Sequence, residues 1–119
     1  MNRPRAAKRY GQHFLEPAWA DKLVAAIDPH SGDRFLEIGP GPGALTLRLA
    51  PRVAHLTAVE IDHRMIAALT PKLPPNVTIV AGNILETDLG PLTSGGSLRV
   101  AGNLPYNVSS PILFELIRA

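Results

Sequence analysis

The sequence predicts an α/β fold in which an open, mainly parallel β-sheet is flanked by helices. Short apolar runs typical of buried strands alternate along the chain with segments whose apolar residues recur at helical spacing. This alternation is typical of parallel βαβ units joined by right-handed crossovers. A glycine-rich loop that directly follows the first apolar run supports the same fold. With 119 residues and no internal repeat, the chain is expected to form one domain.

Helices are predicted where a start signal coincides with an apolar face. Pro17 suits a first helical turn, and Trp19, Leu23 and Ile27 fall on one face, which predicts a helix over residues 17–27. Ser109 or Ser110 can cap a last helix that has Pro111 in its first turn. The further predicted helices are 44–49, which ends before Pro51, 63–69 with an extension to 73 left open, and 109–117.

Four strands are predicted from the short apolar runs, and they cover residues 34–38, 56–61, 77–81 and 98–101. Residues 86–96 contain three glycines and are predicted as a loop that can include one helical turn. With this connectivity the expected sheet order is 3-2-1-4. The fourth strand would then lie at an open edge of the sheet, so a homodimer through that edge is expected.

Positive charge is concentrated at the start of the chain. The first 14 residues contain four basic residues and no acidic residue, whereas the remainder carries 8 basic and 10 acidic residues. Such an arm suits the phosphates of a nucleic acid, although a solvated terminus explains it equally well. The absence of cysteine excludes disulfides and thiolate metal sites and fits a cytosolic or organellar protein, and we expect a cytoplasmic one. There is no apolar stretch of membrane-spanning length and no signal-peptide core.

The glycine loop E-I-G-P-G-P-G-A-L-T predicts a ligand site after the first strand. Gly39 and Gly41 would let the backbone approach a ligand closely, and Glu60, at the end of the second strand, is placed to bind ribose hydroxyls. The spacing leaves a dinucleotide site open. Against it stand Glu37, where apolar packing is usual, and two prolines that remove N–H donors for a pyrophosphate. A nucleoside ligand without phosphates, such as S-adenosylmethionine (SAM), tolerates that loss.

A second motif, N-L-P-Y, follows the fourth strand and lies at the same sheet edge. Asn103 offers an amide oxygen, Leu104 and Pro105 offer carbonyl groups, and Tyr106 offers a ring face for stacking. Two acceptors and a stacking surface suit the exocyclic amine of an adenine base. Holding its N–H bonds would direct the nitrogen lone pair at an electrophile such as the methyl group of SAM, and alignment would matter more than a strong base.

Four segments together resemble a known family: R-Y-G-Q-H-F-L (9–15), L-E-I-G-P-G-P-G-A-L-T (36–46), V-E-I-D (59–62) and G-N-L-P-Y-N-V-S-S-P (102–111). They resemble the KsgA-type ribosomal RNA small-subunit adenine dimethyltransferases, which are related to the Erm methylases. The resemblance implies a Rossmann-like class I SAM-dependent methyltransferase fold. It also implies SAM as cofactor, small-subunit ribosomal RNA in an immature 30S-type particle as partner, and dimethylation of adenosine N6 as activity.

The resemblance also implies a role for each matching residue. His13, Leu15, Gly39 and Gly41 would line the cofactor, and Glu60 would hold its ribose. Ile61 would lie beside its adenine ring and Asn83 would meet the adenine amine. Asn103 would face both cofactor and target, and Leu104, Pro105 and Tyr106 would complete the catalytic loop. Two positions depart from the family, which usually has Asn at position 13 and Asp at position 83, and both departures bear on the affinity for SAM.

Length is the largest departure, because family members are about twice as long on the usual domain-size expectation. We expect residues 1–14 to be a basic arm and residues 15–119 to be the N-terminal part of the SAM-binding domain. The expected function is that of an rRNA adenine N6-dimethyltransferase in the form of its SAM-binding part. Two alternatives stay open, namely an inactive SAM-binding module and part of a dinucleotide-dependent oxidoreductase.

Overall fold

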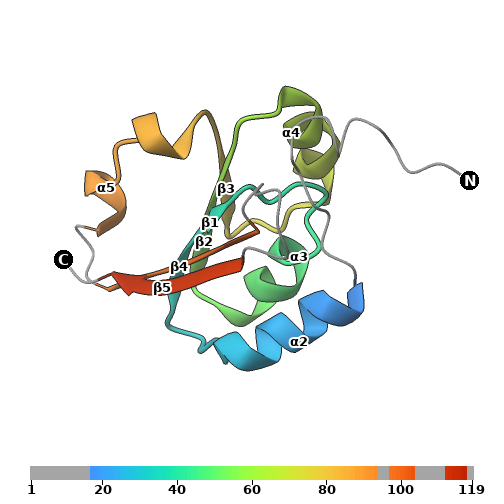
Figure 1. Cartoon of the computed structure of the whole chain (residues 1–119), viewed down its shortest axis with the longest axis vertical. Coiled ribbons are helices and arrows are strands. Elements are labelled where there is room, and N and C mark those ends of the chain that lie inside the picture. Colours follow the sequence, from blue (N-terminus) through green and yellow to red (C-terminus); the bar gives the residue numbers. More distant parts are fainter. Residues whose placement is uncertain (1–16, 94–96, 104–111, 118–119) are drawn as a thin grey trace, which may run out of the picture.

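The computed structural model describes residues 17–93, 97–103 and 112–117, which form one five-stranded sheet of order β3-β2-β1-β4-β5 (Figure 1). The strands are β1 (Arg34–Ile38), β2 (His55–Glu60), β3 (Val77–Ala81), β4 (Leu98–Asn103) and β5 (Ile112–Ile117). The first four pair in parallel, with β1 between β2 and β4. The predicted parallel order 3-2-1-4 is therefore confirmed.

Helices precede and connect the parallel strands, as the sequence predicts. They are α2 (Pro17–Ile27), α3 (Thr46–Leu49), α4 (His63–Leu69) and α5 (Gly90–Thr93), with 3-10 turns η1 (Ala50–Arg52), η2 (Thr70–Lys72) and η3 (Ile84–Glu86). α3 is followed directly by the 3-10 turn η1, which includes Pro51. Proline is tolerated there because it lies in the first turn, where its missing N–H is not needed. α5 is the single helical turn expected within residues 86–96. Among the described residues, every helix is too short or too polar to cross a lipid bilayer.

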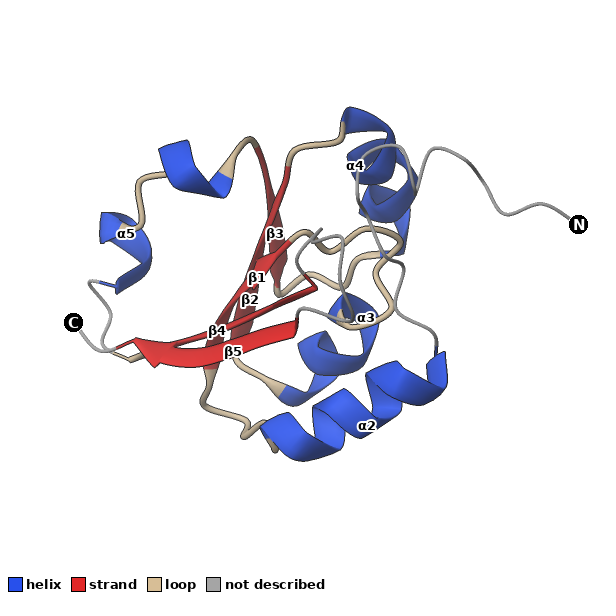
Figure 2. Cartoon of the chain, viewed as in Figure 1, coloured by secondary structure: helices blue, strands red, loops and turns tan. Residues whose placement is uncertain are grey.

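The alternating side chains of β1 build a core on each face of the sheet. Phe35 packs with Val24 of α2 and Leu49 of α3 on one face. Leu36 packs on the opposite face with Leu98 and Val100 of β4, against which Ile84, Leu89 and Leu92 lie. Figure 2 shows α2 and α3 on one side of the strands and α5 on the other. The sheet is thus covered on both faces, as a parallel sheet requires.

The last segment differs from its prediction. Residues 109–117 were expected to form a helix, but Ile112–Ile117 forms β5, which pairs antiparallel with β4 from Leu98↔Ile117 to Asn103↔Ile112. The run I-L-F-E-L-I is rich in isoleucine and has an aromatic residue, which favours a strand. Pairing also satisfies the outer N–H and C=O groups of β4, which a helix would leave open. The exposed β4 edge on which the expected homodimer depended is therefore covered by β5.

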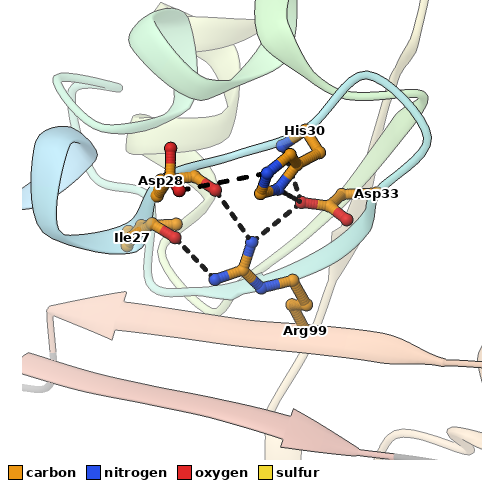
Figure 3. A network of polar contacts seen from close by, with 5 residues as sticks. All are labelled: Ile27, Asp28, His30, Asp33 and Arg99. Atoms are coloured by element: carbon orange, nitrogen blue, oxygen red, sulfur yellow. Dashed lines mark hydrogen bonds and ion pairs between the residues drawn. The ribbon is translucent and has the colours of Figure 1, made fainter.

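Arg99 of β4 holds the C-terminal end of α2 and the turn before β1 (Figure 3). Its guanidinium donates to Asp33 Oδ2 at 2.8 Å, to the Ile27 carbonyl at 2.6 Å and to the Asp28 carbonyl at 3.4 Å. Its guanidinium carbon lies 5.1 Å from the centre of the Phe35 ring. Asp28 has a φ of 52°, a left-handed conformation that commonly ends a helix. We call this group the Arg99 clamp, and it lies at the sheet edge where β1 and β4 begin.

Candidate functional site

The carboxyl ends of the four parallel strands meet at one sheet edge, where ligands bind in open α/β folds. The glycine loop (Gly39–Gly43) follows β1, Glu60 ends β2 and Asn83 lies two residues after β3. Asn103 is the last residue of β4, where its backbone pairs with Ile112. The structure thus brings Gly39, Gly41, Glu60, Ile61, Asn83 and the backbone of Asn103 to one edge. His13, Leu15, Leu104, Pro105 and Tyr106 lie outside the described residues.

Every backbone N–H of the glycine loop is already bonded within the protein. Gly39 donates to the Val59 carbonyl, Gly41 to Glu60 Oε1 and Gly43 to the Pro40 carbonyl, at 2.9, 3.0 and 2.9 Å. All three glycines have positive φ, with values of 68°, 56° and 95°, and the two prolines have no N–H. A pyrophosphate would therefore find no free donor between residues 39 and 43. The loop favours a ligand that does not need phosphate binding at this point.

Glu60 is buried and oriented by the backbone on both sides of its carboxylate. Glu60 is only 3% exposed. Oε1 accepts the Gly41 N–H and Oε2 accepts the Asp62 N–H, each at 3.0 Å. A carboxylate has about four lone-pair positions, so each oxygen keeps one for a further donor. Two adjacent hydroxyl groups fit that remaining capacity.

The strand end that carries Glu60 is fixed from two neighbouring strands. The Val59 carbonyl accepts from Gly39 at the β1 side, and the Glu60 carbonyl accepts from Gly82 at the β3 side, both at 2.9 Å. These bonds extend the sheet ladder by one residue beyond the paired strands. The backbone below the Glu60 carboxylate is consequently held by both adjoining loops.

Glu37 is a second buried carboxyl group at this edge. It is 2% exposed and accepts a hydrogen bond from Thr46 Oγ1 of α3 at 2.5 Å. Burial raises the pKa of Glu37 to about 7, the Thr46 hydroxyl opposes this, and the charge of Glu60 adds to it. Sequence reasoning used Glu37 only as an argument against a dinucleotide and did not find Thr46. The position of Thr46, three residues after Gly43, was the available signal.

Asn83 orders the loop after β3. Its side-chain oxygen accepts the Leu85 N–H at 2.9 Å and caps η3, while its carbonyl accepts from Thr87 Oγ1 at 2.8 Å. The carboxamide oxygen that was expected to meet an adenine amine thus already accepts a hydrogen bond from η3. Two apolar residues flank this point, Ile61 at 62% and Leu85 at 88% exposure. The exposure of Leu85 was not predicted from the sequence, because a leucine shortly after a strand is expected to be buried in the core.

The described residues contain no group of three or more His, Asp or Glu side chains that could hold a metal ion. The family model of the ribosomal RNA adenine dimethylases matches residues 3–119. The chain belongs to the ribosomal RNA adenine dimethylase family. This membership confirms the expected resemblance and gives the dinucleotide-dependent alternative no support.

Similar proteins of this family are found in several bacteria. The chain is 47% identical over 117 residues to "Ribosomal RNA small subunit methyltransferase A" of Acidithiobacillus ferrooxidans, covering 96% of this chain and 44% of that protein. It is 48% identical over 119 residues to the protein of the same name from Thiobacillus denitrificans, covering 98% and 45%. The chain therefore spans slightly less than half the length of the curated relatives it matches.

Solved structures show the same fold. A dimethyladenosine transferase from Plasmodium falciparum matches with a TM-score of 0.61 at 22% identity, over 76% of this chain and 43% of that chain. The 23S rRNA methyltransferase ErmE matches with a TM-score of 0.61 at 23% identity, over 78% and 48%. An RNA methyltransferase from Salinibacter ruber, solved with S-adenosylhomocysteine, matches with a TM-score of 0.56 at 17% identity, over 75% and 76%. The rRNA adenine dimethylase chain thus has a class I methyltransferase fold.

Proposed function

We propose that this chain is the SAM-binding part of an enzyme that dimethylates N6 of adenosines in small-subunit ribosomal RNA. The observation that carries the proposal is the buried Glu60 carboxylate beside a glycine loop without free N–H donors. The Glu60 carboxylate can accept hydrogen bonds from ribose hydroxyls, and the glycine loop offers no N–H donor to a pyrophosphate. Membership of the rRNA adenine dimethylase family supports the reaction and the RNA substrate. An enzyme that methylates small ribosomal subunits would act in the cytoplasm.

The described residues fit SAM by the chemistry of their free groups. Glu60 keeps one acceptor position on each oxygen for the two ribose hydroxyls, and the backbone N–H groups of Gly41 and Asp62 fix the carboxylate for them. The exposed side chains of Ile61 and Leu85 offer apolar surface for an adenine ring. When bound, SAM supplies an electrophilic methyl group on a sulfonium ion.

The target adenosine is assigned to the N-L-P-Y motif, residues 103–106. Asn103 and the carbonyl of Leu104 or Pro105 would accept the N–H bonds of N6 and direct its lone pair, while Tyr106 would stack on the base. The basic arm of residues 1–14, with Arg3, Arg5, Lys8 and Arg9, would bind RNA phosphates. These groups orient the reactants, and orientation with exclusion of water is the main requirement of methyl transfer.

Replacing Glu60 by alanine tests the cofactor assignment. Each hydrogen bond from a ribose hydroxyl to a carboxylate contributes about 1.5–3 kcal/mol, so Glu60→Ala should weaken S-adenosylhomocysteine at least about tenfold. Titration calorimetry measures this, with Glu86→Ala as control because Glu86 is exposed in η3. Equal affinity of wild type and Glu60→Ala would remove Glu60 from the site. Tight binding of NADH would instead support the oxidoreductase alternative.

Replacing Tyr106 by alanine in the full-length protein tests the RNA assignment. Turnover on small-subunit particles should fall far more than affinity for S-adenosylhomocysteine, because stacking acts on the target base alone. Methyl transfer to particles is followed with labelled SAM, and the cofactor titration serves as control. Turnover near the wild-type rate would show that N-L-P-Y is only a turn. Cofactor binding without any methylation by the wild-type protein would support the inactive binding module.

A further inference from the structure

One large exposed side chain has no role in the proposed cofactor site. Among the described residues, the large hydrophobic side chains that are exposed are Trp19, Ile61 and Leu85. Ile61 and Leu85 follow β2 and β3 at the carboxyl ends of the strands, where they are assigned to the adenine ring of the cofactor. Trp19 is 59% exposed, because α2 buries other side chains against the sheet. Its ring is therefore available to a partner outside the fold.

The first turn of α2, which carries Trp19, lies at the same end of the sheet as the proposed site. The Ile27 carbonyl at the other end of α2 is bound by Arg99, which pairs with Phe35 where β1 begins. An 11-residue helix rises about 16 Å, close to the length of a five-residue strand, so α2 spans the sheet to the edge where the strands end. In Figure 1 the first turn of α2, its darkest blue, lies at the far end from the turn that leads into β1. Trp19 is thus at the edge that carries the site loops.

The charge around Trp19 is mainly positive. The Lys22 amino group lies 4.9 Å from the centre of the Trp19 ring, in a cation–π contact along one turn of α2. The neighbouring Asp21 carboxylate accepts a hydrogen bond from Arg48 Nε at 2.7 Å, so its charge is offset. Residues 1–22 carry five basic and two acidic residues, since the basic arm comes just before α2 in the sequence. This turn therefore attracts a polyanion.

An exposed indole ring beside an amino group suits a nucleotide of single-stranded RNA. Every base has a flat π-face that can stack on the ring of Trp19, and the adjoining phosphate would bind the Lys22 amino group. Such a platform reads no sequence, but it fixes where the strand lies. An apolar protein surface would leave Lys22 and the basic arm without an opposite charge. The charge around the ring therefore favours RNA.

We propose that Trp19 stacks on a base that flanks the target adenosine in the RNA strand, with Lys22 bound to the neighbouring phosphate. This inference rests on the proposed function, in which residues 103–106 hold the target base itself. The flanking subsite holds the strand on one side of the target and makes no contact with the cofactor. Trp19 and Lys22 therefore contribute to the affinity for RNA, whereas the affinity for S-adenosylhomocysteine does not depend on them.

Fluorescence tests the subsite directly, because Trp19 is the only tryptophan of the 119-residue chain. The probe is a single-stranded oligoriboadenylate of about ten nucleotides, a length typical of single-strand binding sites. Stacking should quench the Trp19 emission during the titration, whereas an abasic oligoribonucleotide of equal length, which has only sugars and phosphates, should bind without quenching. Emission that shifts with protein concentration in the absence of RNA would place a second copy of the chain on Trp19 and overturn the proposal.

Two substitutions separate stacking from charge. Trp19→Ala should weaken binding of the oligoadenylate at least about fivefold, measured by the fluorescence anisotropy of a labelled strand, and should leave binding of the abasic strand within about twofold. Lys22→Gln should weaken both strands and lower the salt slope of binding by about one. Lys72→Gln is the matched control, because Lys72 is exposed in η2 shortly before β3 begins, and it should change neither quantity. Circular dichroism should show an unchanged fold in Trp19→Ala, since Trp19 is exposed.

A titration with S-adenosylhomocysteine separates failure of this inference from failure of the proposed function. Wild-type affinity for the oligoadenylate in Trp19→Ala, or equal quenching by the abasic strand, overturns the stacking subsite. So does a chain that binds S-adenosylhomocysteine but no oligoadenylate, and in each of these cases the cofactor assignment stands. Loss of S-adenosylhomocysteine affinity in Trp19→Ala would place Trp19 in the cofactor site and overturn the subsite as well. Binding of neither ligand by the wild type overturns the proposed function and the inference together.

Discussion

The Arg99 clamp should make a large contribution to the stability of the fold, and Arg99→Met measures it. Methionine keeps apolar contact with the Phe35 ring but loses the bonds to Asp33 and to the Ile27 and Asp28 carbonyls. The side chains of Arg99 and Asp33 are only 17% and 21% exposed, so water replaces these bonds poorly. Removing one partner of such a pair should lower the free energy of unfolding by about 2–3 kcal/mol.

Urea denaturation followed by circular dichroism gives that free energy, with Arg52→Met as control because Arg52 is exposed in η1. The control should change it by less than about 0.5 kcal/mol. Burial raises the pKa of Asp33, but the His30 N–H and Arg99 outweigh burial and hold that pKa below its ordinary value of 3.8. The stabilisation is thus present above that pH and is lost as pH falls, and the acid-side loss should be shallower in Arg99→Met. Equal stability of the two methionine variants would refute the clamp.

Two further predictions concern the sheet itself. Because the pKa of Glu37 is raised, its contribution to stability is complete below pH 4.5 and is lost as pH rises through about 7. The free energy of unfolding of the wild type, measured in urea, should therefore fall by about 2–3 kcal/mol between pH 5 and 8, and Glu37→Gln should remove this fall. Parallel pH curves for variant and wild type would contradict this. Gly102→Ala should lower the free energy of unfolding by about 1–3 kcal/mol, because the new Cβ would lie 2.9 Å from the Ile38 carbonyl oxygen. Gly32→Ala places its Cβ in open space and should leave that free energy nearly unchanged in the same assay. Equal effects of the two variants would contradict the close packing at Gly102.

The sheet order was predictable because its signals are local. Short apolar runs and the glycine loop mark β1 to β4, and right-handed crossovers leave few orders for them. β5 was not predictable in this way. Pro111 after two serines is a common helix start, whereas the composition of residues 112–117 also suits a strand. The unpaired edge of β4, which the local sequence does not reveal, favours the strand. Tertiary pairing decided between two patterns that the residues alone allowed.

Residues of the candidate site were predicted from the sequence, but the contacts between them were not. Glu60 and the glycine loop were found because their separation along the chain follows from the βαβ unit. Their hydrogen bond to each other was not, because the direction of the Gly41 N–H depends on a left-handed conformation of the loop. Thr46 pairs with Glu37 only because α3 packs on the face toward which Glu37 points. Such contacts depend on helix placement, which residue spacing does not specify.

The bonds from Gly39 and Gly82 to the end of β2 have a thermodynamic consequence. Four backbone amides hold this residue and its carboxylate: one donates to the Glu60 carbonyl, one to the neighbouring Val59 carbonyl and two to the carboxylate oxygens. The carboxylate therefore loses little conformational entropy when a ribose binds. Ligand association at Glu60 should then require no slow ordering of this edge and should proceed at one rate, without a separate isomerisation phase. Amide exchange at Gly39, Gly41 and Gly82 should be slow before any ligand is added, and ligand should slow it little further.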